Sequence, residues 1–301
     1  MASFLNALPG AIGQGLIWGI MAVGVYITFR VLDFADLTVD GTLATGGAVL
    51  VFSMFHGVNV YLALLIAFAA GCVTGLVTGL LHTRFGIPPI LAGILTQLAL
   101  YSVNLRILGK ANQPLSVYKY HLIASITNIK QAIVVVAVIA VGLIAALYWY
   151  FGTELGMSIR ATGCNIHMAK ANGINTNKTK ILALVLSNGI VALAGGLLTQ
   201  YQGFADINMG RGAIVIGLAA VIIGEVIFGK IFRNFALRLL SVVIGGIIYY
   251  IVMQFVVSIG LNTDDLKLLT AAIVALFLGI PYIKGRWAET HVKTKGDANN
   301  A

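Results

Sequence analysis

Residues 10–41 read GAIGQGLIWGIMAVGVYITFRVLDFADLTVDG, and this stretch decides the fold. Residues 10–30 form an apolar run long enough to cross a bilayer as a helix, which takes about 20 residues. Three acids, Asp33, Asp36 and Asp40, interrupt the apolar character before a shorter, glycine-bearing apolar segment follows. The stretch therefore predicts a membrane helix, a polar break and a second, shorter helix.

The composition of the 301-residue chain agrees with that prediction. Hydrophobic residues make up 59% and charged residues 10%, against about 25% charged in a typical soluble domain, and the mean hydropathy is +0.96. Such a chain cannot cover itself with a water-facing surface, which excludes a soluble enzyme, a nucleic-acid binder and a disordered scaffold. We expect an all-α polytopic transmembrane helix bundle, with residues 1–301 as one domain.

Apolar runs predict eight to ten spans, and the second and seventh are short and glycine-rich, as broken or re-entrant helices are. The positive-inside rule favours a cytoplasmic 152–180 segment, which puts the N-terminus outside and the C-terminal tail inside. The net charge of +9 is then a topology signal, not a sign of nucleic-acid binding. The runs lie at 10–30, 41–56, 60–81, 88–108, 131–151, 181–201, 212–229, 236–257 and 266–283.

An internal repeat relates the two halves of the chain. The FADL of Phe34–Leu37 returns as the FADI of Phe204–Ile207, and each copy stands between a long apolar run and a short glycine-bearing one. In the predicted topology the first break faces inside and the second outside, so the halves, 14–108 and 184–283, are inverted. Inverted repeats with interrupted helices are typical of transporters. Coincidence is the alternative, because a chain rich in Gly, Ala and Leu matches itself easily.

The two breaks hold the richest group of polar residues and are the predicted pathway. A helix N-terminus near the bilayer midplane would also favour a carboxylate group on the substrate. For Asp40, capping the short helix that follows it and lining the pathway are equally good readings. The candidate pathway residues are Asp33, Phe34, Asp36, Asp40, Phe204, Asp206, Asn208 and Arg211.

Other features predict packing and not chemistry. Gly71, Gly75 and Gly79 form a small-residue stripe that predicts close contact with another helix backbone. Glu225, near the inner end of a span, is expected to pair with a basic residue nearby, with a role in transport as the alternative. The GxxxxGK match at 224–230 is rejected as a nucleotide site, because Ile231 replaces Ser/Thr and the strand–loop–helix setting is missing. The histidines and cysteines have no metal or catalytic spacing, so we expect no catalytic residue, metal or cofactor in this chain.

The polar segment at 152–180 is the most informative part of the predicted cytoplasmic side. Asn165 is a good cap for a short helix that carries Ile166, Met168 and Ala169, and Gly173 can end it. An ordinary solvated loop is the alternative, but apolar residues are an odd choice for one.

This segment resembles the cytoplasmic coupling loop of ABC-importer permeases for branched-chain amino acids and simple sugars. The resemblance rests on the pattern Gly156-x3-Arg160-Ala161-x-Gly163-x-Asn165-x3-Ala169-x3-Gly173-Ile174-Asn175. The first break is similar to the family's NFAHG-type segment, with Asp33 and Asp36 replacing its Asn and His. DFADLTVDG is also similar to a subgroup that looks like aromatic amino-acid importers.

The resemblance implies the membrane-spanning subunit of an importer in the bacterial cytoplasmic membrane, not an enzyme, carrying a small polar solute, with an amino acid favoured over a sugar. Its partners would be a second permease copy in a homodimer, ATPase subunits that hold ATP and Mg²⁺, and an extracytoplasmic substrate-binding protein. Ala169 would face a groove on the ATPase, and Arg160 would pair with an acid there or hold the loop's own carbonyls. The residues implied in coupling are Arg160, Gly163, Asn165, Ile166, Met168, Ala169 and Gly173.

Two other classes remain open from the sequence. A self-sufficient secondary carrier coupled to H⁺ or Na⁺ accounts for the inverted repeat but gives the coupling-type loop no purpose. A channel-like membrane protein likewise accounts for the repeat but not for the coupling-type loop.

Overall fold

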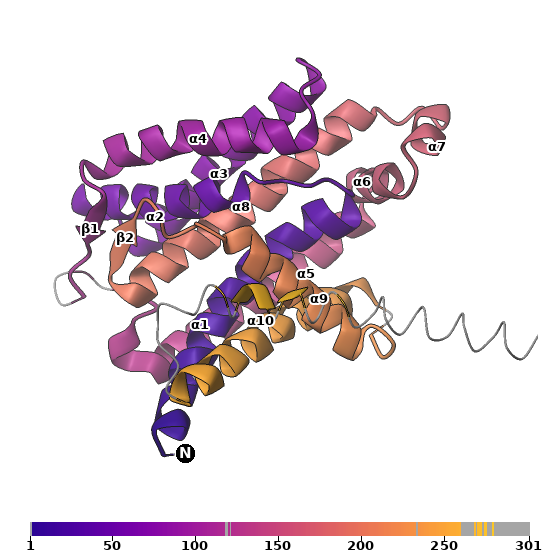
Figure 1. Ribbon diagram of the computed structural model, residues 1–301. Helices are drawn as coiled ribbons and strands as arrows, with labels where there is room; N and C mark the ends of the chain where they lie inside the picture. Colours follow the sequence, from indigo (N-terminus) through magenta and orange to yellow (C-terminus); the bar gives the residue numbers. More distant parts are fainter. Residues whose placement is uncertain are drawn as a thin grey trace, which may run out of the picture.

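The computed structural model describes residues 2–117, 120, 122–232 and 234–259, with isolated positions between 268 and 279, and this part is a helical bundle (Figure 1). The all-α prediction is confirmed. In chain order the elements are α1 (Ala2–Tyr26), the π-helical turn η1 (Ile27–Val31), α2 (Val39–Phe55), α3 (Val60–Thr83), α4 (Pro89–Leu108), strand β1 (Asn112–Pro114), the 3-10 turn η2 (Ile126–Asn128), α5 (Ile129–Gly152), α6 (Glu154–Cys164), α7 (Ile166–Ala171), α8 (Thr176–Gln202), strand β2 (Phe204–Asp206), α9 (Ala213–Phe228) and α10 (Phe235–Ser258).

Six helical segments among the described residues are long and apolar enough to cross a membrane. They contain α1, α3, α4, α5, α8 and α10. Helices α2 and α9 have 17 and 16 residues, so each is about 25 Å long and falls short of the roughly 30 Å hydrocarbon core. These are the two runs predicted to be short or broken. The predicted ninth span, 266–283, lies mostly outside the described residues.

Each long helix that precedes a break packs against the other half of the chain. Helix α8 lies along α2 and α3, while α1 lies along α9 and α10. The two halves are therefore interlocked, since neither long helix packs mainly against the short helix that follows it in sequence. The same relation thus occurs twice, once for α1 and once for α8, as an internal repeat would predict.

Glycines allow α3 and α8 to approach closely. A Cβ added to Gly71 or Gly75 would collide with the backbone carbonyl oxygen of Asn188 or Leu184 on α8, and one on Gly79 would lie 3.2 Å from Cα of Ile181. The predicted close contact of this stripe with another helix is confirmed. Backbones in lipid associate where small residues permit such contact.

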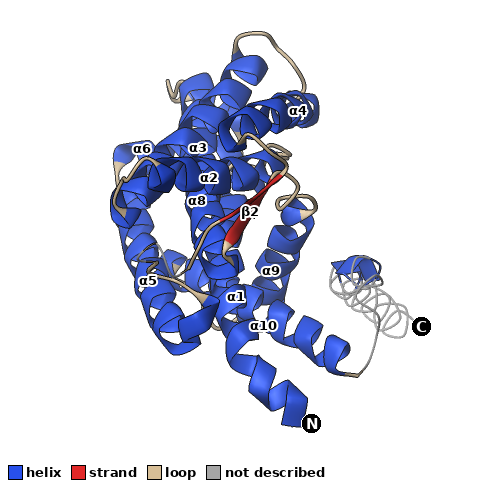
Figure 2. Ribbon diagram, turned by 90° about the vertical axis from the view of Figure 1, so that its left-hand side faces the viewer, coloured by secondary structure: helices blue, strands red, loops and turns tan. Residues whose placement is uncertain are grey.

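The bundle has two distinct ends. At one end β1 and β2 pair antiparallel, with Asn112 opposite Asp206, and at the other lie α6 and α7 (Figure 1). Figure 2 looks at the molecule from the strand-bearing end, with β2 in front of the helices. In the predicted orientation the strands lie on the outer side and α6 and α7 on the cytoplasmic side.

Candidate functional site

The first break starts with a change of helix type. Turn η1 extends α1 by π-type hydrogen bonding, and the chain then turns at Asp33, which is exposed and has φ +57°. Aspartate tolerates this left-handed conformation better than most residues. Phe34 is buried, and its ring meets the ring of His82 edge-on with centroids 5.2 Å apart. Asp33 and Phe34 thus shape and anchor the turn.

Asp36 is a buried acid that ties the first break to α8. Only 2% of it is exposed, and its two carboxylate oxygens accept hydrogen bonds from the backbone N–H of Thr38 (2.9 Å) and from Nδ2 of Asn188 (2.7 Å). Thr42 donates in turn to Oδ1 of Asn188 (2.7 Å). Because both carboxyl oxygens are hydrogen-bonded, this buried acid ties the first break to α8, and Asn188 is a residue that the sequence analysis missed.

A chain of threonine hydroxyls continues this network between α2, α3 and α4. Thr42 and Thr74 are 2.9 Å apart, Thr38 and Thr78 are 2.7 Å apart, and Thr78 donates to Thr96 (3.0 Å). The sequence did carry a signal for it, since Thr74 and Thr78 are four residues apart beside the glycine stripe. Interhelical hydrogen bonds of this kind fix helix positions in a membrane bundle.

Asp40 does not cap its own helix, which corrects one of the two readings of this residue. Its carboxylate accepts hydrogen bonds from the backbone N–H groups of Gly212 and Ile214, both 2.9 Å, at the start of α9. A carboxylate satisfies the free N–H groups of a helix N-terminus and is favoured by the helix dipole. The cap therefore joins the start of α2 to the start of α9, 172 residues away in sequence.

The second break is organised by Asp206. One carboxylate oxygen accepts from the backbone N–H of Asn208 (2.7 Å), and the other accepts from Nδ2 of Asn112 on β1 (3.2 Å). Phe204 begins β2 and is 37% exposed. Asp206 thus closes a turn and ties it to the neighbouring strand.

Residues from both breaks meet at one cavity of about 300 Å³. The first break contributes Asp40, and the second contributes Asn208 and Arg211. Of the eight candidate pathway residues, these three are brought together, while Asp33, Phe34, Asp36, Phe204 and Asp206 do not line this cavity. Helix α4 supplies Gln97, Tyr101 and Asn104, which the sequence analysis missed although their i, i+4, i+7 spacing puts them on one helix face.

In the 152–180 segment, Asn165 caps α7 as predicted. Its Oδ1 accepts from the backbone N–H groups of His167 and Met168, each at 3.0 Å, and Gly173 ends the turn at φ +78°. Ala169 is only 2% exposed, whereas Met168 is 65% exposed. The expectation that Ala169 faces outward is wrong: it lies on the inner side of α7, and Met168 is the apolar side chain that α7 presents.

Helix α6 contacts several membrane helices at the end of the bundle that is predicted to be cytoplasmic. A Cβ on Gly163 would collide with the carbonyl oxygen of Val31 in η1, and Thr162 is 2.9 Å from Thr179 on α8. The Arg160 guanidinium lies 5.2 Å from the ring centroid of Phe235 at the start of α10. The sequence analysis did not consider this cation–π contact, and the pairing of Arg160 with an acid on an ATPase stays a prediction.

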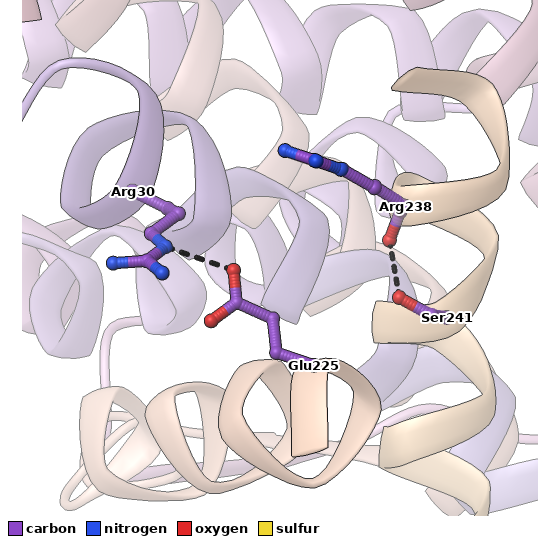
Figure 3. Close-up of polar contacts among 4 residues, drawn as sticks. All are labelled: Arg30, Glu225, Arg238 and Ser241. Carbon is purple, nitrogen blue, oxygen red and sulfur yellow. Dashed lines mark hydrogen bonds and ion pairs between the residues drawn. The ribbon is translucent and has the colours of Figure 1, made fainter. Parts of the chain in front are cut away.

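An ion pair connects η1 to α9. Nε of Arg30 donates to Oε1 of Glu225 at 2.9 Å, and the two side chains point toward one another across the helices (Figure 3). The expectation that Glu225 pairs with a basic residue is confirmed, although the partner lies 195 residues away in sequence. Figure 3 also shows Ser241 donating to the backbone carbonyl of Arg238 on α10, at 2.7 Å.

Two further sequence expectations concern cofactors. The GxxxxGK match includes the C-terminal end of helix α9, so the strand–loop–helix setting of a nucleotide loop is missing there. Within the described residues, no three His, Cys, Asp or Glu side chains gather as they would around a metal ion. Two helix breaks whose residues meet at one polar cavity, in a bundle of membrane-length helices, are typical of transport proteins.

Comparison with known proteins agrees with that class. The family model described as "Branched-chain amino acid transport system / permease component" matches residues 8–283, so the chain belongs to this family. It is the membrane-spanning permease subunit of an ABC importer, a multi-pass protein of the cytoplasmic membrane.

Three similar proteins illustrate the range of the relationship. A tyrosine transport system permease protein of Clostridioides difficile (strain R20291) is 38% identical over 96% of both chains. A fructose import permease protein of Bifidobacterium longum (strain NCC 2705) is 26% identical over 79% of this chain and 67% of that protein. A solved structure of PsaBC from Streptococcus pneumoniae in complex with Fab matches 84% of this chain and 95% of that chain at 17% identity, with a TM-score of 0.41.

Proposed function

We propose that this permease imports an amino acid, with aromatic amino acids as the first candidates. The observation that carries the substrate class is the 38% identity, over 96% of both chains, to a permease named for tyrosine transport. We further propose that it works as a homodimer, with separate ATPase subunits that bind ATP and Mg²⁺ and an extracytoplasmic protein that delivers the substrate.

The ATPase would dock on α7. Met168 is 65% exposed on a helix that is fixed by the Asn165 cap, and His167 and Lys170 are exposed beside it. Full burial of a methionine side chain stabilises a contact by about 1.5–3 kcal/mol. A capped helix that offers one apolar side chain among polar ones suits a pocket on a partner subunit.

Motion of this loop would reach the pathway through α6 and α9. Gly163 packs against Val31, and Arg30, the residue before Val31, pairs with Glu225 near the end of α9. The other end of α9 is capped by Asp40, which lines the cavity. Because a helix moves as a nearly rigid element, a shift of α6 would be felt at the cavity.

We assign the eight residues of the breaks to two roles. Asp40, Asn208 and Arg211 would line the solute pathway, because they border the cavity. The other five, Asp33, Phe34, Asp36, Phe204 and Asp206, would hold the two breaks in shape.

The test is uptake of labelled L-tyrosine by cells that express the permease together with its ATPase and binding protein. Met168→Asp should lower uptake at least tenfold and reduce co-purification of the ATPase, because an unpaired charge buried at an interface costs about 3–5 kcal/mol. Met168→Leu, which keeps the side chain apolar and similar in volume, is the matched control and should transport normally. Full uptake and ATPase retention by Met168→Asp would remove α7 from the mechanism, and uptake without any ATPase would favour a self-sufficient carrier.

A further inference from the structure

The cavity between the breaks and α4 has the size and polarity of a small-solute site. Its volume of about 300 Å³ lies at the lower end of the range for ligand pockets, roughly 300–1,000 Å³. The polar side chains around it come from three separate parts of the chain. They are Asp40, Gln97, Tyr101, Asn104, Asn208 and Arg211.

One polar atom at the cavity is buried and unsatisfied. Asn104 is 1% exposed, and its Nδ2 donates to the carbonyl oxygen of Gly41 at 3.3 Å. Its Oδ1 has no hydrogen-bond partner in the part of the chain that the structure describes. Leaving a buried acceptor unpaired costs about 1–3 kcal/mol, so a small turn of the Asn104 side chain that brings this oxygen to the cavity would be rewarded by a hydrogen bond from a ligand N–H group.

The cavity also carries one charge of each sign. Arg211 presents a guanidinium, whose planar set of donors matches a carboxylate. Asp40 presents a carboxylate, and its hydrogen bonds to Gly212 and Ile214 use one lone pair on each oxygen. A carboxylate has about four lone-pair sites, so Asp40 retains capacity for a further donor.

We propose that this cavity binds the zwitterionic head group of an amino acid in transit. Arg211 binds the α-carboxylate, Asn104 and Asp40 accept from the α-ammonium, and the ring of Tyr101 contacts the solute's side chain. A neutral sugar would pair with neither the Arg211 guanidinium nor the Asp40 carboxylate. An anionic lipid head group would be repelled by the carboxylate of Asp40. The inference rests on the proposed import of an amino acid and assigns where that solute binds within the permease.

The first measurement is binding by the purified full-length permease in lipid nanodiscs, followed by saturation-transfer NMR. The probes are L-tyrosine, L-tyrosine methyl ester, which has no carboxylate, and N-acetyl-L-tyrosine, which has no ammonium group. We expect L-tyrosine to bind, and each modified probe to bind roughly 10–100-fold more weakly, the loss expected for one charge-assisted contact. Equal binding of all three probes would overturn the proposal, and so would no binding of L-tyrosine.

The second measurement uses variants. Arg211→Gln removes the guanidinium from an exposed position and should weaken L-tyrosine binding by the same 10–100-fold. Arg106→Gln is the matched control, because Arg106 is also exposed and lies on α4 but does not line the cavity. Unchanged binding by Arg211→Gln, or an equal loss with Arg106→Gln, would contradict the site.

Uptake by cells with the complete transporter separates this inference from the function on which it rests. Wild-type uptake of L-tyrosine with normal uptake by Arg211→Gln would leave the proposed function standing and remove the zwitterion site. Wild-type cells that import no amino acid, or that import ribose or fructose instead, would overturn both. Uptake that falls with Arg211→Gln and stays normal with Arg106→Gln supports both.

Discussion

The contact between α3 and α8 predicts that Gly75 tolerates no side chain at all. A Cβ on Gly75 would lie 2.6 Å from the carbonyl carbon of Leu184 and 2.9 Å from Cα of Val185. Since carbon atoms pack best at about 3.5–4.0 Å, Gly75→Ala must separate the two helices by roughly 1 Å. Both of these neighbours are backbone atoms, so a change of rotamer cannot absorb the strain.

The cost can be worked out from the hydrogen bonds that depend on the position of α3. A shift of about 1 Å would stretch the Thr42–Thr74 contact of 2.9 Å and the Thr38–Thr78 contact of 2.7 Å beyond useful range. Each lost bond costs about 0.5–1.5 kcal/mol, and lost packing adds to this, so we expect Gly75→Ala to destabilise the protein by about 2–4 kcal/mol.

Gly142 in α5 is the matched control, because a Cβ there would meet no atom within 4 Å. Gly142→Ala should leave stability unchanged or raise it by up to about 1 kcal/mol through helix propensity. The assay is thermal unfolding of both variants in detergent, followed by size-exclusion chromatography. We expect the melting temperature of Gly75→Ala to fall by roughly 4–16 °C, at about 2–4 °C per kcal/mol. Equal melting temperatures for the two variants would refute the close-packing argument.

Three further predictions concern coupling and symmetry. The Gly163→Ala variant should insert into the membrane normally but transport poorly, because its Cβ would collide with a backbone carbonyl of η1. Gly152→Ala is the control in the same uptake assay and should transport normally, because a Cβ there has no atom within 4 Å. Charge reversal at Arg30 or Glu225 alone should lower uptake, and the double exchange should restore part of it. The free energy of unfolding should change by no more than about 1 kcal/mol, because the pair is partly exposed. Equal uptake by the single and double variants would exclude a role for the pair. In an experimental structure, the two repeat halves should superpose by rotation about a twofold axis in the membrane plane. An axis along the membrane normal would contradict the inverted repeat.

The sequence by itself determined the features that depend on local pattern. Apolar runs of about 20 residues and their polar interruptions predict membrane helices and breaks whatever surrounds them. The stripe of Gly71, Gly75 and Gly79 shows which face of its helix permits close approach, because helical spacing alone sets that face. Asn165 could likewise be recognised as a cap, since it bonds only to the next turn of the chain.

Only the tertiary structure decided which partner covers each of these faces. The carboxylates of Asp40 and Asp36 reach residues on α9 and α8, far away in sequence, and no local rule names those partners. Ala169 and Met168 are neighbours in sequence, yet one is buried and the other exposed, which depends on how α7 lies against α6 and α8. The cavity exists because α4 lies beside both breaks, which its own sequence does not specify. Side-chain periodicity specifies the direction in which a residue points from its helix, and the packing of the whole bundle specifies what it meets there.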